Sequence, residues 1–337
     1  MLAEGFSPKT TALVTGGTGY TGRVLVRKLV ELGVNVRVIA RSSSKRGDLE
    51  QLPIDWYTGD VFDASVVADA MKGVNYVFHV AAAFREAKIT DEVYHQVHVE
   101  STQHLARQAL EEPNFRRFVH VSTVGVHGHI DDPPANEEYR FAPGDVYQRT
   151  KAEAEQWIRG FSNTSDLPLS VVRPAAIYGP EDKRLLKLFK MSARPVFPLF
   201  GRAQGFYHLI HVDDLTDIFI TAALHDNALG EVFIAGNPEP TRLKDIAVSI
   251  ATALTSKPPL FVRLPVWPLF VAAYLCENIC KPFGIEPPIY KRRVAFFTKD
   301  RAFDTTKLRR KLDYKYSFSV EQGLSSTANW YREAGWL

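Results

Sequence analysis

Two side chains that can exchange a proton stand four residues apart, Tyr147 and Lys151, in a segment whose alanines and Trp157 indicate a helix. Residues at this spacing share one helix face, so the ammonium can act on the phenol. A free tyrosine has a pKa of about 10, and a neighbouring cation stabilises its phenolate, which brings the group toward the range useful for acid–base catalysis. The same spacing also occurs on exposed helix faces. The neighbouring elements therefore determine whether the pair is catalytic or only part of an exposed face.

A pair of hydroxyl side chains lies shortly before this helix. The apolar run 115–121 indicates a buried strand, and Ser122 and Thr123 follow it directly. The next segment, 124–144, is rich in proline, glycine and polar residues, which is typical of a loop that can edge an active site. This context favours a catalytic Tyr147 over a tyrosine on an exposed helix face.

A glycine-rich turn near the start of the chain predicts a dinucleotide site. The run 12–14 before it indicates a buried strand, the apolar spacing after it indicates a helix, and 34–40 indicates a second strand. In such a unit the first glycine permits a tight turn, the second lets the backbone approach a pyrophosphate, and the third lets the helix pack closely on the strand. An ordinary strand-to-helix turn is the alternative, against which this context argues. The cofactor contacts predicted in the turn are Gly16, Thr18, Gly19, Tyr20, Thr21 and Gly22.

The end of the second predicted strand indicates which dinucleotide binds. An acidic residue there would hydrogen-bond the adenosine ribose, whereas this chain has Ala40 followed by Arg41 and, in the same loop, Lys45. Because cations suit a 2′-phosphate, we expect NADP, with NAD as the second choice. A solvated basic loop is the alternative interpretation.

Two further strand ends add predicted cofactor contacts. The run 54–61 indicates a third strand that ends in a carboxylate, which can accept a hydrogen bond from the adenine amino group or cap the helix that begins near Asp63. The run 74–80 indicates a fourth strand that leads into small residues, which leave room for a ribose and pyrophosphate or are simply helix-forming alanines. The contacts predicted at these two strand ends are Asp60, Val61, Ala81 and Ala82.

The composition of the 337 residues argues against several classes of function. A net charge of +3 provides no basic field for nucleic acid. Cys276 and Cys280 are too few for a disulfide framework and lack further metal ligands, so we expect no metal and interpret them as buried small residues. No apolar leader precedes the first strand, and the run 264–276 is shorter than the ~20 residues of a spanning helix. We therefore expect a cytoplasmic protein.

Together these motifs, in this order from Thr11 to Trp330, resemble the extended short-chain dehydrogenases/reductases. This superfamily includes nucleotide-sugar epimerases, 3β-hydroxysteroid dehydrogenases and dihydroflavonol reductases. The resemblance implies an α/β fold of the Rossmann type, with a doubly wound parallel sheet of about seven strands and a smaller, interleaved C-terminal substrate-binding domain. The division that we expect is a dinucleotide-binding unit of residues 1–182 and strand 231–236, and a substrate-binding unit of 183–230 and 237–337.

The resemblance also implies roles for individual residues. By matching position, Tyr147 is the general acid/base, and Lys151 is the partner of the phenol and the cofactor ribose. Thr123 supplies the hydroxyl that orients the substrate oxygen, and Ser122 is the next candidate for that role. The same matching gives Asp60 and Val61 to the adenine site and Ala81 and Ala82 to the pyrophosphate. It adds Pro174 and Ile177 as the nicotinamide contacts.

Three departures from the family pattern narrow the function. His98 begins the stretch His-Val-Glu-Ser-Thr where members often carry Asn-Val-x-Gly-Thr. Thr123 lacks the Asp-Glu pair that follows it in dehydratases, which argues against elimination chemistry. Tyr207 stands where nucleotide-sugar enzymes commonly place an arginine, four residues before His211, to hold the substrate diphosphate.

The C-terminal part points to an apolar substrate. With the stretch 298–304 before a final helix pair, it resembles the 3β-hydroxysteroid dehydrogenase branch most. Residues 263–275 are strongly apolar, and Lys281 and the basic run 291–293 follow a proline-rich break. One interpretation is a wall for a large apolar substrate that makes peripheral membrane contact through 263–293. The alternative is a buried packing helix or a dimer contact.

The sequence thus predicts an NADP(H)-dependent oxidoreductase that interconverts a secondary alcohol and a ketone on a mainly apolar, steroid-like or other hydrophobic small molecule. One rival is an NAD-dependent nucleotide-sugar 4-epimerase, which uses the same tyrosine. A rival of another class is a non-catalytic dinucleotide sensor, against which the Tyr147 and Lys151 pair argues. The resemblance further implies a homodimer built from helices near 91–110 and 147–160.

Overall fold

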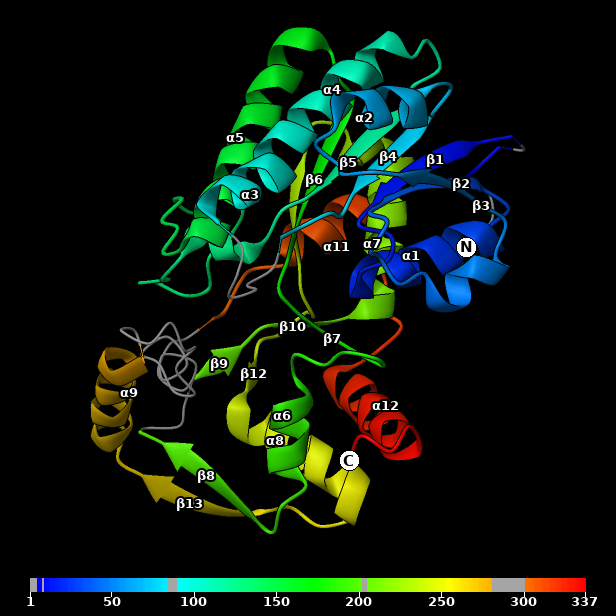
Figure 1. Cartoon of the computed structure of the whole chain (residues 1–337). Helices are drawn as coiled ribbons and strands as arrows, with labels where there is room; N and C mark the ends of the chain where they lie inside the picture. The colour runs from blue at the N-terminus through cyan, green and yellow to red at the C-terminus, as the bar shows by residue number, and fades with distance from the viewer. Residues whose placement is uncertain (1–4, 8, 84–89, 202–204, 281–300) are drawn as a thin grey trace.

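A seven-stranded, wholly parallel sheet lies at the centre of the chain in this computed structural model, which describes residues 5–7, 9–83, 90–201, 205–280 and 301–337 (Figure 1). Its strands are β1 (Thr11–Thr15), β2 (Asn35–Ala40), β3 (Ile54–Thr58), β4 (Tyr76–His79), β5 (Arg117–Val121), β6 (Leu169–Pro174) and β11 (Val232–Ala235). Their order is β11-β6-β5-β4-β1-β2-β3, so the direction of winding reverses between β1 and β4. This doubly wound order confirms the predicted Rossmann-type α/β fold.

Helices cover both faces of the sheet, as buried parallel strands require. Leu13 of β1 points into a core shared with the helices of one face, whereas its neighbours Ala12 and Val14 point into the core on the other face. The first face carries α2 (Ala64–Met71), α4 (Ser101–Glu111) and α5 (Val146–Ser165), and the second carries α1 (Tyr20–Glu31), α7 (Val212–Leu224) and α11 (Thr306–Leu312).

A second group of elements lies below the sheet in Figure 1 and has its own apolar core, in which Phe189, Phe197, Ile250 and Tyr331 meet. Among the described residues it contains three two-stranded sheets: β7 with β10, β9 with β12, and β8 with β13. Its elements are β7 (Ala176–Tyr178), α6 (Leu186–Ser192), β8 (Val196–Phe200), β9 (Phe206–Tyr207), β10 (Leu209–His211), β12 (Thr241–Arg242), α8 (Leu243–Thr255), β13 (Leu260–Leu264), α9 (Trp267–Cys280) and α12 (Val320–Glu333).

The division into two units stays a proposal, and the packing suggests one change to it. Residues 183–230 were expected to belong to the substrate-binding unit, but α7 within them packs in the same core as β1 and α1. The same holds for Leu308 and Leu312 of α11. We therefore propose that α7 and α11 belong with the dinucleotide-binding unit.

The segment expected as one helix near 91–110 is divided into three. It consists of α3 (Asp91–His95), a single π-helical turn, η2 (Gln96–Glu100), and α4. A π turn inserts an extra residue into a helix, and such turns occur frequently at functional sites. The short 3₁₀ segments of the chain are η1 (Gly47–Gln51), η3 (Val124–His127) and η4 (Asp226–Ala228).

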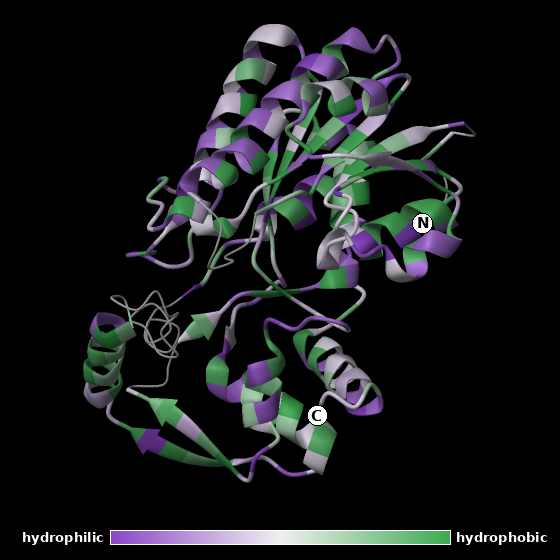
Figure 2. Cartoon of the chain, viewed as in Figure 1, coloured by the Kyte–Doolittle hydropathy of each residue, from purple (hydrophilic) through white to green (hydrophobic). Residues whose placement is uncertain are grey.

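Helix α9 is exposed, which corrects two expectations. Trp267 and Ile279 are 67% and 63% exposed, and Ala273 is the buried residue of the helix. Figure 2 shows α9 as mostly hydrophobic along its length, at the edge of the molecule. It is therefore not a helix packed in the core of this chain, and Cys276 and Cys280 are half-buried rather than buried. The basic residues expected to follow it, Lys281 and 291–293, lie outside the described residues.

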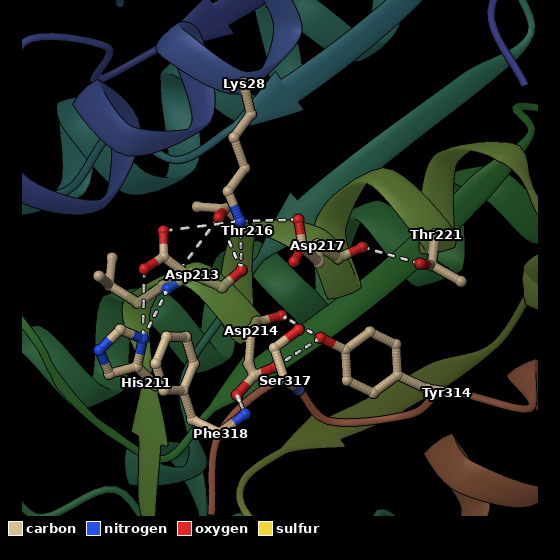
Figure 3. A network of polar contacts seen from close by, with 11 residues as sticks. Lys28, His211, Asp213, Asp214, Thr216, Asp217, Thr221, Tyr314, Ser317 and Phe318 are labelled. Atoms are coloured by element: carbon tan, nitrogen blue, oxygen red, sulfur yellow. Dashed lines mark hydrogen bonds and ion pairs between the residues drawn. The ribbon is translucent and has the colours of Figure 1, made fainter. Parts of the chain in front are cut away.

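A buried carboxylate on α7 fixes the C-terminal part of the chain to the sheet unit (Figure 3). Asp214 accepts hydrogen bonds from the Tyr314 hydroxyl (3.0 Å), the Ser317 amide (2.7 Å) and the Phe318 amide (3.3 Å). Burial raises the pKa of Asp214 above its usual range, although these three donors act in the opposite direction. One side chain thus positions the segment that leads into α12.

Replacing Asp214 with alanine should lower the free energy of unfolding by about 2 to 3 kcal/mol, because it leaves the Ser317 and Phe318 amides without their acceptor. The Tyr314 hydroxyl keeps the main-chain carbonyl of residue 214 as an acceptor at 3.0 Å. Asp213, the next residue on α7, is 38% exposed and pairs with Lys28 at 3.6 Å. Asp213→Ala should therefore cost less than about 1 kcal/mol. Denaturant unfolding measures both variants, and equal losses would contradict the role given to Asp214.

Candidate active site

One cavity of about 1840 Å³ opens along the carboxyl ends of the six strands β1 to β6. This is the edge at which doubly wound sheets bind ligands, next to the reversal of winding. Residues from the glycine-rich turn, from the ends of these strands and from α5 meet there. The predicted residues that line it are Gly16, Thr18, Gly19, Tyr20, Thr21, Gly22, Arg41, Asp60, Val61, Ala81, Ala82, Ser122, Thr123, Tyr147, Lys151, Pro174 and Ile177, whereas Lys45 does not.

The glycine-rich turn fits a pyrophosphate. Gly16 has a φ of +69°, and a side chain there would come within 2.8 Å of the Ala81 backbone. A side chain at Gly22 would lie 2.1 Å from the Gly16 carbonyl oxygen, so α1 can pack this closely only with glycine. Gly19 is the N-cap of helix α1, so the helix has no side-chain cap, and it has no acidic residues in its first turn. Its first amides are therefore available to an anion.

The end of the cavity expected to hold the adenosine carries Arg41, Ser44 and Asp60. Capping of α2 is performed by Asp63, whose carboxylate accepts from the Ser65 amide at 2.9 Å, so the capping alternative does not apply to Asp60. Arg41 is exposed at the cavity rim. Lys45 is also exposed, and its carbonyl accepts from Arg23 of α1 at 3.1 Å, which holds that part of the loop against the helix.

Lys151 is almost fully buried at the centre of the site. Its ammonium donates to the carbonyl oxygens of Val121 (2.9 Å) and Ala81 (3.4 Å), at the ends of β5 and β4. Burial lowers the pKa of Lys151 to about 8. An ammonium has three N–H groups, so the two carbonyls fix its position and leave a donor for the cavity. The sequence predicted the phenol and ribose as its partners and did not indicate these two carbonyls.

Three hydroxyl groups line the cavity beside Lys151. The Thr123 oxygen accepts from the Gly125 amide at 3.0 Å, so its own proton remains available to a substrate oxygen. Ser122 is buried, and its hydroxyl has no hydrogen-bond partner among the described residues. Tyr147 stands one helical turn before Lys151 on α5, and its ring packs edge-on against that of His98, with centroids 5.4 Å apart. The arrangement can protonate and hydrogen-bond a carbonyl oxygen.

The far end of the cavity holds residues that sequence reasoning missed. Leu188 and Met191 come from α6, and Phe303 and Arg301 come from the segment before α11. Phe303 is fixed there because its amide donates to the His208 ring at 3.1 Å. No local motif marks these positions, because long-range packing brings them together. Tyr207, singled out as the replacement for an arginine, also lines this end.

Comparison with known proteins identifies the family. The model of the NAD dependent epimerase/dehydratase family matches residues 12–236, which contain the turn, the strand ends and Tyr147. The chain belongs to this family. Its relatives include proteins named as 3β-hydroxysteroid dehydrogenases, and together with the family match they indicate an NAD(P)-dependent oxidoreductase of the extended short-chain type.

Two curated relatives and one solved structure illustrate what the chain is similar to. The 3 beta-hydroxysteroid dehydrogenase/Delta 5→4-isomerase of Mycobacterium tuberculosis is 28% identical over 95% of this chain and 90% of its own length. The UDP-glucose 4-epimerase of Vibrio cholerae is 26% identical over 76% of this chain and 79% of its own. The crystal structure of gox2253 superposes with a TM-score of 0.79 and 27% identity, over 98% of this chain and 100% of that one.

Proposed function

We propose that this protein is an NADP(H)-dependent oxidoreductase that interconverts a secondary alcohol and a ketone on a mainly apolar substrate. The observation that carries the proposal is that Thr123, Tyr147 and Lys151 open onto the same cavity as the glycine-rich turn. At its far end, Leu188, Met191 and Phe303 contribute apolar surface beside the cations Lys187 and Arg301. The relative named as a steroid dehydrogenase supports the apolar substrate class.

Three side chains of the site have different roles at the carbonyl group of the substrate. A bound nicotinamide supplies or accepts the hydride at the carbonyl carbon. Tyr147 gives its phenolic proton to the carbonyl oxygen during reduction and takes it back during oxidation. Thr123 donates a hydrogen bond to the same oxygen, because its acceptor side is used by Gly125. Lys151, held by two main-chain carbonyls, stabilises the phenolate with its charge.

The far end of the cavity supports an apolar substrate over a nucleotide sugar. Leu188, Met191 and Phe303 contribute apolar surface there, and Tyr207 occupies the place at which the family pattern puts a phosphate-binding arginine. A tyrosine cannot replace the bidentate hydrogen bonds of a guanidinium to a phosphate. The epimerase among the relatives keeps a nucleotide-sugar 4-epimerase as the second candidate.

A substrate screen separates the two candidates. The purified protein should reduce members of a panel of steroids, flavonoids and other apolar ketones with added NADPH, and it should not interconvert UDP-glucose and UDP-galactose. Bound NAD that survives purification, together with turnover of the UDP-sugars, would favour the epimerase instead. Inactivity toward both sets of compounds, despite tight NADPH binding, would contradict both.

The choice of NADPH is tested at Arg41. We expect Arg41→Ala to raise the Kd of NADPH about 10-fold or more, because a charge-assisted contact with the 2′-phosphate is lost, while the Kd of NADH changes less than about twofold. Lys45→Ala is the matched control, since this cation of the same loop does not line the cavity, and it should leave both constants nearly unchanged. Fluorescence titration measures all of them, and equal weakening of both cofactors by Arg41→Ala would argue against the NADP preference.

Two proposed contacts concern surfaces outside the cavity. Exposed apolar residues of α9, among them Trp267 and Tyr274, support the peripheral membrane contact predicted for 263–293. Within the described residues, no helix is both long enough and apolar enough to pass through a bilayer. The homodimer through the helices near 91–110 and 147–160 also stays a proposal.

A further inference from the structure

A buried histidine connects the π turn to the helix that carries Tyr147. His98 lies in η2, is fully buried and does not line the cavity. Its Nε2 accepts from the Ala83 amide at 3.1 Å, and its Nδ1 lies 2.8 Å from the Thr150 hydroxyl of α5. The imidazole thus joins the segment after β4, which lines the cavity, to the first turn of the catalytic helix.

The hydrogen bonds assign one tautomer to this imidazole. Because Nε2 accepts from an amide, it carries a lone pair, and the proton of the neutral ring must lie on Nδ1. Nδ1 then donates to the Thr150 oxygen, and the Thr150 hydroxyl donates to the carbonyl of Val146 at 2.9 Å. Burial and the charge of Lys151 lower the pKa of His98 well below its usual value, so the ring stays neutral.

A second histidine fixes the other side of the same turn. The Ala81 amide donates to the Thr15 hydroxyl (3.2 Å), which lies 2.8 Å from Nδ1 of His79. Nε2 of His79 lies 3.2 Å from the Ser101 hydroxyl, which itself donates to the Val97 carbonyl of the π turn at 2.6 Å. Through these hydrogen bonds, strands β1 and β4 fix the position of the π turn η2. The hydrogen bond of His98 to Thr150 then fixes α5 relative to that turn.

We propose that His98 is the positioning residue of Tyr147: its neutral imidazole, fixed between the Ala83 amide and the Thr150 hydroxyl, sets where the phenol stands in the cavity. This inference rests on the proposed role of Tyr147. The edge-on contact between the two rings adds a direct restraint on the phenol. A shift of the phenol by about 1 Å can lower the rate of the chemical step by as much as about 100-fold, although His98 touches no substrate.

Kinetics of four variants test the proposal. His98→Leu, which keeps the site apolar but removes both hydrogen bonds, should lower kcat about 10-fold to 100-fold with the KM values for NADPH and ketone within about threefold. His98→Gln, whose amide can both accept and donate, should restore most of kcat. Thr150→Val removes only the hydroxyl on α5 and should reproduce the loss, which keeps the test valid if His98→Leu folds poorly. The control is His120→Leu, because His120 is equally buried and neither of its ring nitrogens has a partner among the described residues.

Nitrogen-15 NMR of the histidine rings in the cofactor-free protein provides a readout that does not depend on turnover. His98 should appear as the neutral Nδ1–H tautomer from pH 6 to 8. A protonated ring or the other tautomer in this range would overturn the proposal, as would normal kcat in both His98→Leu and Thr150→Val, or an equal loss in His120→Leu. Normal turnover in both His98→Leu and Thr150→Val, beside an inactive Tyr147→Phe, would refute this inference alone, whereas full turnover in Tyr147→Phe would refute the proposed function.

Discussion

Tyr147→Phe should lower kcat for ketone reduction about 1000-fold or more, while the Kd of NADPH changes less than about threefold. The substitution removes the one proton that the proposed mechanism gives to the carbonyl oxygen, and general acid catalysis of this kind contributes about 10²- to 10⁴-fold. The ring itself and its contact with His98 are kept, so the cavity should retain its shape. Steady-state kinetics and fluorescence titration measure the two quantities.

A second tyrosine near the loop of the site supplies the matched control. The Tyr139 hydroxyl accepts from the Asp131 amide at 3.0 Å, and Tyr139 is not among the residues that line the cavity. Tyr139→Phe should therefore keep kcat within about twofold of the original protein. Near-normal turnover in Tyr147→Phe would show that another group supplies the proton, and a comparable loss in both variants would indicate a structural effect.

The parts of the site that could be predicted from the sequence are those formed by residues within one strand and the helix that follows it. Gly16 and Gly22 sit where the turn and the packing of α1 leave no room for a side chain, so their spacing alone predicts the geometry. Tyr147 and Lys151 are related by one turn of a single helix. The seven parallel strands follow in the same way, since alternating apolar runs and helical segments leave few other arrangements.

The parts that could not be predicted depend on contacts between segments distant in sequence. Lys45 has the right charge in the right loop, yet Arg23 of α1 holds that part of the loop by its carbonyl. Phe303 reaches the cavity through a bond to His208, a residue far earlier in the chain. His98 was singled out only as a departure from the family pattern, because a π turn leaves no mark in apolar spacing and its partners Ala83 and Thr150 come from other segments. Helix α9 was ambiguous for a related reason: apolar composition does not say whether the chain itself covers a helix.

Lys151→Met should have opposite effects on activity and stability. It removes the charge that supports the phenolate, so kcat should fall about 100-fold or more. At the same time it removes an ammonium that is almost fully buried, with a pKa lowered to about 8 by that burial. Keeping it charged at pH 7 costs about 3 kcal/mol. Allowing for the lost bonds to Val121 and Ala81, we expect the variant to be about 2 kcal/mol more stable than the original protein at pH 7.

The pH dependence of this stability difference between the original protein and Lys151→Met shows whether it comes from the buried charge of Lys151. Because the pKa of Lys151 in the folded chain lies below its value of 10.5 when unfolded, the unfolded chain binds more protons between pH 8 and 10.5. The original protein should therefore gain stability relative to the variant as pH rises through this window, and the difference seen at pH 7 should disappear near its upper end. Arg149→Met, which removes an exposed cation of the same helix, should show no such trend. Denaturant midpoints at several pH values measure it, and a variant less stable at pH 7 would mean that the two carbonyls fully compensate the burial of the charge.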